Sequence, residues 1–368
     1  MPNCSALLDN NLLTLTLLCI CITVVRTFEE YYRYSAADSK NKGFQKSLLW
    51  GITDDFFLVI LYGSLNIGRY LVMRLKHDAR WSSPTLYDVP MIICGVSRVI
   101  CMMILEMAMD GTSFLTLRMN ISMIILVPLT FALHHFLFRT SFTRYKFLSI
   151  SCVIILYLCV TLPFLMTDIE KNGFMFTPKR YLKIVAIICA WFPLAVSLLF
   201  SEYLLYDVQV SSANIFHVIA FNYKTFLYGF IFRLLIMMIS ITIDAATSQT
   251  FYDDLLSFSN EFLEMLKSNK TGTSLVSIIT DFIHWFIIGG LSTYQEGSLV
   301  NAICFCTEIP VKVVISNSKI FGELMTAYIM IFAAVIILPT LILLINAMKP
   351  VPESSSAVII RRTSFAED

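Results

Sequence analysis

The sequence predicts an all-α integral membrane protein with ten transmembrane helices, arranged as two inverted five-helix repeats. Two observations predict this fold class. Of the 368 residues, 57% are hydrophobic and only 14% are charged, whereas soluble domains carry about a quarter charged residues. The apolar residues also fall in blocks of about 20, the length that a helix needs to cross a hydrocarbon core about 30 Å thick.

Ten apolar segments, each bounded by charged or turn residues, account for the expected helices. The first has no basic residue before it and no small-residue cleavage pattern after it, so we expect a transmembrane helix there rather than a signal peptide. The ten segments are 11–25, 48–73, 87–108, 113–138, 146–166, 182–204, 216–242, 273–293, 297–316 and 322–347.

Five segments fall in each half of the chain, which predicts two repeats, residues 1–166 and 167–347. Pro128 and Pro310 lie 182 positions apart, and around both an apolar helix, a short polar break and a last apolar helix follow in the same order. An odd number of helices per repeat inverts the second half relative to the first, as in inverted-repeat transporters. Residues 348–368 are polar and predict a disordered cytosolic tail.

Residues with catalytic or metal-binding chemistry do not cluster in the sequence. The five histidines are scattered, and nine of the ten cysteines fall inside apolar segments, where cysteine behaves as a small hydrophobic residue. The sequence has no nucleophile–base arrangement, zinc motif or phosphate loop. We therefore expect no enzymatic activity, cofactor or metal and, at a net charge of +1, no nucleic-acid partner.

Several ionisable residues lie in the middle of predicted helices. A charge there costs about 2.5–3.5 kcal/mol and persists when it faces a cavity or an opposite charge. Glu308 and Lys312 have the spacing and order of an intrahelical ion pair, and Arg98 and Glu106 lie nearly on one helix face. The residues expected to serve proton coupling or structural ion pairs are Arg98, Glu106, Asp281, Glu308 and Lys312.

A second set of polar residues predicts a substrate cavity. Arg118 has no acid within one turn of its own helix, and Thr116 and Asn120 beside it form a polar strip. Arg118 either faces a central cavity or pairs with Glu106 or Asp88 of the preceding segment. Excess cations suit an anionic substrate such as a phosphate or nucleotide group. The expected cavity residues are Arg118, Thr116, Asn120, Asn222, Lys224 and Asn301.

The stretch Ser113-Phe114-Leu115-Thr116-Leu117-Arg118 resembles the S-F-x-x-L-R start of the fourth helix in solute carrier family 35, most like its F branch, within the drug/metabolite transporter superfamily. The chain departs from that pattern at Met119, where glycine is usual, and at Leu115, which replaces a common glutamine. The resemblance implies ten helices in two inverted repeats, cytosolic termini and alternating access around a central cavity. Similar landmarks lie at Pro84-x-x-x-Asp88, Leu137-Phe138-Arg139, Arg144-Tyr145-Lys146, Ser201–Leu205 and Gly229-Phe230.

The expected function is therefore that of a multi-pass transporter of a small solute, anionic and nucleotide-sugar-like, working as an exchanger or a proton-coupled carrier. Two alternatives stay open: a chloroquine-resistance-type transporter of amino acids, peptides or drugs, and a membrane receptor or signalling protein. The expected partners are a small-molecule substrate and the lipid bilayer, with a homodimer left open. The resemblance favours an endomembrane (Golgi, ER, lysosome or vacuole) over the plasma membrane.

Overall fold

The computed structural model describes residues 44–76, 88–108, 122–138, 144–172, 178–205, 214–247, 271–294 and 296–306, and a few residues between 14 and 25 and between 256 and 263. Helices fill these ranges except at residues 292–294 and 296, which lie in a turn, and no described residue lies in a strand. A helix without a label, Gly297–Cys306, follows the last labelled one. The labelled helices are α2 (Phe44–Lys76), α3 (Asp88–Ala108), η3 (Met123–Ile125), α5 (Leu126–Phe138), α6 (Arg144–Asn172), α7 (Pro178–Leu205), α8 (Asn214–Thr247) and α10 (Thr271–Leu291).

Four described helices, α2, α3, α7 and α8, are long and apolar enough to cross a membrane. By length and composition, this part of the chain is an all-helical membrane protein, as predicted. Eight of the ten predicted segments, from 48–73 to 297–316, contain a described helix. Segment 322–347 and the tail lie outside the described residues, as does most of 11–25. The count of ten spans and the two inverted repeats stay predictions.

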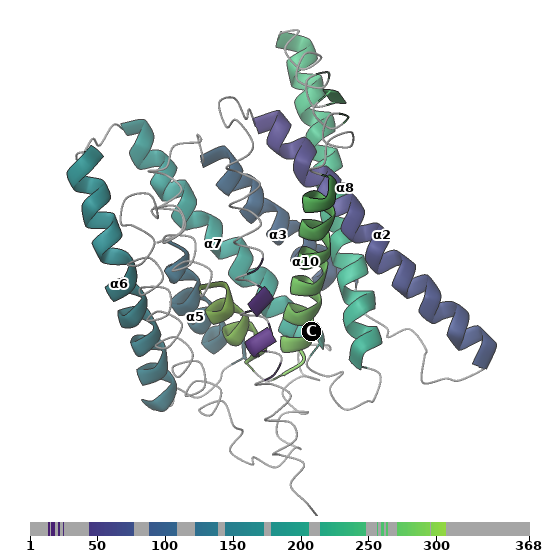
Figure 1. The fold of residues 1–368 in the computed structure, drawn as a ribbon, viewed down its shortest axis with the longest axis horizontal. Coiled ribbons are helices and arrows are strands. Elements are labelled where there is room, and N and C mark those ends of the chain that lie inside the picture. The colour runs from purple at the N-terminus through teal and green to yellow at the C-terminus, as the bar shows by residue number, and fades with distance from the viewer. Residues whose placement is uncertain are drawn as a thin grey trace, which may run out of the picture.

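The helices pack side by side as a bundle, with α6 at one edge and α2 at the other (Figure 1). The helix pairs with the most extensive contacts are α3 with α7, α2 with α8, and α3 with α8. Helix α2 runs antiparallel to α8, since Leu48 and Tyr62 of α2 pack against the later and earlier parts of α8 respectively. The start of α3 likewise meets the end of α7, where Met91 packs on Leu205.

The backbones of α3 and α8 approach closely at two glycines, Gly95 and Gly229. A Cβ built on Gly95 would lie 2.4 Å from the backbone oxygen of Thr225, and one built on Gly229 would lie 2.9 Å from Arg98 Nη2. Small residues let the backbones of membrane helices approach this closely. The contact places the side chain of Arg98 against α8.

The main buried cluster joins α3, α5, α6, α7, α10 and Gly297–Cys306. Large apolar side chains also cover the outward surface, which is typical of a face in contact with lipid. Examples, all more than half exposed, are Ile67, Leu75, Leu148, Leu182 and Met238.

Candidate functional site

Three charged side chains meet in the middle of the bundle. Asp55 of α2 lies between Arg98 of α3 and Arg233 of α8, and all three are buried. Arg98 Nη2 donates a hydrogen bond of 3.0 Å to Asp55 Oδ1. Arg233 Nε lies 2.8 Å from Asp55 Oδ2, an ion pair by distance whose N–H is not aligned for a hydrogen bond. Two guanidinium groups thus contact one carboxylate, and these three residues are called here the Asp55 cluster.

The surroundings of the Asp55 cluster fix its arginines in place. The guanidinium carbon of Arg98 lies 3.9 Å from the centre of the Phe226 ring and 5.4 Å from that of Trp285, so cation–π attraction offsets part of the cost of burial. On the other side, a Cβ on Gly51 would lie 1.7 Å from Arg233 Nη1. Glycine at position 51 is therefore what gives the Arg233 side chain its space.

A small cavity of about 20 Å³ lies beside Arg98, where α3, α7, α8 and α10 meet. Since about 10–15 Å³ suffices for one water molecule, the cavity is too small in this state for a larger solute. Arg98 Nε, which is buried, has no hydrogen-bond acceptor among the described residues. Apart from Ile288 and Gly289, the other lining residues are polar or aromatic: Cys94, Ser197, Ser201, Phe221, Asn222, Thr225, Phe226 and Trp285.

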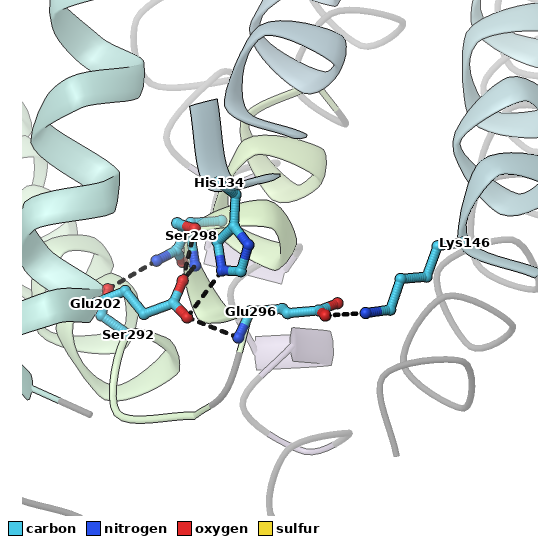
Figure 2. A network of polar contacts seen from close by, with 7 residues as sticks. His134, Lys146, Glu202, Ser292, Glu296 and Ser298 are labelled. Carbon is cyan, nitrogen blue, oxygen red and sulfur yellow. Dashed lines mark hydrogen bonds and ion pairs between the residues drawn. The ribbon is translucent and has the colours of Figure 1, made fainter. Parts of the chain in front are cut away.

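A second buried network surrounds Glu202, near the end of α7 (Figure 2). Its Oε1 accepts hydrogen bonds from the backbone N–H of Glu296 (2.8 Å) and lies 3.1 Å from His134 Nε2 of α5. Its Oε2 accepts from the backbone N–H of Ser298 (3.0 Å) and from the Ser298 hydroxyl (2.6 Å). Glu202 therefore holds the first residues of helix Gly297–Cys306, where backbone N–H groups favour a negative charge.

The segment that Glu202 holds is the turn between α10 and helix Gly297–Cys306, called here the 292–296 turn. It reverses the chain within a few residues: Glu296 has a φ of 61°, and a Cβ on Gly297 would lie 2.1 Å from the Leu291 oxygen. Asn301 Nδ2 donates to the Ile288 oxygen (3.1 Å) and to Ser292 Oγ (3.0 Å). The turn, the end of α10 and the following helix are thus tied into one unit.

The side chain of Glu296 reaches away from Glu202 and forms an ion pair with Lys146 of α6 (Figure 2). Both side chains are buried. The two acids therefore attach the 292–296 turn to three helices: Glu202 to α7 and α5, and Glu296 to α6.

A third ion pair lies at the surface. Lys224 Nζ of α8 is 3.0 Å from Asp88 Oδ1 at the start of α3, and the Tyr228 hydroxyl donates to the same oxygen at 3.1 Å. The side chains of Asp88 and Lys224 are 61% and 37% exposed, so water weakens this pair.

The residues expected to line a cavity have different surroundings. Asn222 is buried, lines the cavity and donates to the Trp285 oxygen at 3.2 Å. Lys224 pairs with Asp88, and Asn301 braces the turn. Arg118, Thr116 and Asn120 lie outside the described residues.

The residues expected to form ion pairs or coupling groups are also separated. Arg98 pairs with Asp55; the side chain of Glu106, its expected neighbour, lies outside the described part of the chain. Asp281 is half-buried on α10. Glu308 and Lys312 follow the last described residue, Cys306.

Sequence reasoning missed Asp55, His134 and Glu296 as members of buried networks. Asp55 had a visible signal, since an acid in the middle of an apolar segment needs a partner. His134 and Glu296 had none, because their partners lie 68 and 150 residues away in sequence.

Comparison with known protein families finds no match, and no curated protein matches the sequence. Ten chains among solved structures match the fold. One of them, described only as "Crystal structure of protein", is 11% identical, covers 94% of this chain and 99% of its own, and has a TM-score of 0.50. At that identity the likeness concerns the fold alone.

Proposed function

We propose that this protein is a membrane carrier of a small anionic solute, and that the cavity beside Arg98 is the solute site. The observation that carries the proposal is the buried Arg98 at the cavity wall. Arg98 lines the cavity, shares its only described carboxylate partner with Arg233, and keeps an unused Nε–H. A buried charge in a membrane protein persists where it serves a pathway or a partner.

The other lining groups suit an anion that also has an apolar part. Asn222, Ser197, Ser201 and Thr225 bring an amide and three hydroxyls to the cavity. The rings of Phe221, Phe226 and Trp285 provide flat apolar walls, the combination of a mostly apolar pocket with a few polar groups that typifies ligand sites.

Alternating access is part of the proposed mechanism. In this state the cavity holds no more than one or two water molecules, so a solute enters only after helices move apart. The cavity lies between α3 of the first half of the chain and α7, α8 and α10 of the second half. In inverted-repeat carriers the two halves rock against each other around a site in this position.

Ten spans, two inverted repeats and membership of the drug/metabolite transporter superfamily belong to the same proposal. Their support is the Ser113–Arg118 stretch together with the eight predicted segments that contain a described helix. An endomembrane location follows from that resemblance.

The test is a thermal-stability screen of the purified protein against inorganic phosphate, nucleotides, nucleotide sugars, amino acids and small peptides. A ligand at about 100 times its Kd stabilises the folded state by about 2.7 kcal/mol. We expect an anion to stabilise the wild type and Lys224→Gln, and to lose its effect on Arg98→Gln. Arg98→Gln leaves Asp55 paired with Arg233, so the variant keeps its fold. Stabilisation by amino acids or peptides alone would favour the chloroquine-resistance-type alternative.

A further inference from the structure

We propose that the solute cavity opens toward the end of the bundle at which α3 begins, through a single layer of buried side chains around Met91. This layer is the gate that keeps the cavity closed in this state. The inference rests on the proposed carrier function for the solute that passes, but the opening itself is measurable without any solute.

The layer consists of apolar side chains from three helices. Met91 of α3 forms one buried cluster with Leu204 and Leu205 at the end of α7 and with Phe221 of α8. These four side chains are called here the Met91 layer. Apolar contacts are not directional, so the layer separates and closes again without loss of hydrogen bonds. The unbranched side chain of methionine also adapts readily to new packing partners.

The Met91 layer forms one wall of the cavity. Phe221 belongs to the layer and also lines the cavity, and so does Cys94, which packs in the same cluster. Cys94 follows Met91 by about one helical turn, and Arg98 follows by about one turn more. A displacement of the Met91 side chain therefore exposes the cavity first at Cys94.

On its outer side the Met91 layer reaches the surface within about one helical turn. Asp88, the first residue of α3, has a side chain that is 61% exposed and pairs with Lys224 of α8. Tyr228 of α8 packs on the layer and donates a hydrogen bond to Asp88. Exposed ion pairs contribute little, so this pair holds the outer side of the layer closed only weakly.

The opposite side of the cavity is thicker. From Cys94 back to its first residue, α3 rises about 9 Å, whereas from Arg98 to its last residue it rises about 15 Å. The Asp55 cluster lies on that side, followed by a further buried apolar cluster that contains Val99 and Met103. An opening there separates buried charges, while an opening at Met91 separates apolar side chains only. The Met91 side therefore opens at the lower cost.

Cys94 reports on the opening, because its thiol lines the cavity and is buried in the closed state. The test follows alkylation of Cys94 by N-ethylmaleimide in the purified full chain, with mass spectrometry to separate it from the other cysteines. Cys101 of the same helix is equally buried but is not part of the cavity wall. The quantity measured is the ratio of the alkylation rate of Cys94 to that of Cys101, which removes any general loosening of α3.

Met91→Ala should raise this ratio at least about tenfold, because truncation of a buried side chain weakens the packing of the closed layer. Met103→Ala is the matched control, since it makes the same change at another buried methionine of α3 on the thicker side of the cavity. We expect it to leave the ratio unchanged. An equal rise in both variants, or no rise in Met91→Ala, would overturn the proposal.

Asp88→Asn tests the same route from the surface and does not depend on whether Met91→Ala folds. We expect the ratio to rise about twofold to fivefold, the range that the loss of an exposed ion pair gives. Asp88 itself touches neither Cys94 nor the cavity wall, so a rise shows that the outer pair holds the layer. A ratio equal to that of the wild type would exclude an opening past Asp88.

Failure of the carrier function gives a different result. Inorganic phosphate or a nucleoside monophosphate in excess should slow the alkylation of Cys94 in Met91→Ala, because the anion then fills the cavity beside the thiol. If the rise in Met91→Ala persists but neither anion slows it, the gate stands and the anion site beside Arg98 is wrong. If the anions stabilise the protein while Met91→Ala and Met103→Ala behave alike, the site stands and the gate is wrong.

Discussion

The Asp55 cluster and the Glu202 network are both buried and charged, yet they are built differently. In the Asp55 cluster, side chains bind side chains. In the Glu202 network, an acid binds the backbone of a turn. The first arrangement places the buried Arg98 beside a cavity. The second fixes the position of a backbone segment through one buried charge.

The largest expected effect is on the Asp55 cluster. Asp55→Asn leaves two buried guanidinium groups facing each other without an acid between them, and removal of one partner from a buried ion pair costs about 3–5 kcal/mol. We expect the variant to unfold at a much lower temperature than the wild type in detergent. Adding Arg98→Gln should recover part of the loss, since one uncompensated charge is then removed. A wild-type melting temperature for Asp55→Asn alone would show that the three charges do not depend on one another.

Glu202→Gln should come next in size. The amide keeps the shape of the side chain but presents an NH₂ group to donors, so about 1.5–3 kcal/mol is lost from the strongest of these hydrogen bonds. The loss is measured as the difference in free energy of unfolding between the variant and the wild type at neutral pH. An unchanged free energy of unfolding in Glu202→Gln would contradict the contribution of these hydrogen bonds to stability.

A smaller difference in stability is expected between alanine substitutions at two glycines of α2. Gly51→Ala places a methyl group 1.7 Å from the present position of Arg233 Nη1, so the arginine must shift, at a cost of about 1–3 kcal/mol. Gly68→Ala, on the same helix, meets no atom within 4 Å and should stabilise α2 by about 0.5–1 kcal/mol, because alanine favours helix. Equal melting temperatures of the two variants would contradict the close packing of Arg233 on Gly51.

The smallest effect is expected at the surface. Asp88→Asn breaks the pair with Lys224 in an exposed position, where water and salt already screen the charges. Its melting temperature should stay close to that of the wild type, in contrast to Asp55→Asn, which makes the same chemical change in the buried cluster. A large loss for Asp88→Asn would show that burial does not separate the two pairs.

The sequence was informative about the helices because apolar segments of membrane length have a strong, local signal. The ends of helices α3 and α8 lie within a few residues of the ends of the predicted segments 87–108 and 216–242. The site was predicted only in part: Arg98, Asn222 and Asn301 stood out as polar residues in apolar segments. Their partners did not, since the pairing of Arg98 with Asp55, or of Glu202 with residues 296 and 298, depends on how distant helices pack. No local pattern records that packing.

The most direct measurement is saturable uptake of an anion, chosen by the thermal-stability screen, into proteoliposomes of the wild type, Arg98→Gln and Lys224→Gln. Each variant loses one positive charge, but only Arg98 lines the cavity. We expect uptake by the wild type and Lys224→Gln, and an affinity about tenfold to a hundredfold lower in Arg98→Gln, the range for one hydrogen bond to a charged group. Equal affinities in Arg98→Gln and the wild type would contradict the assignment of the cavity as the solute site.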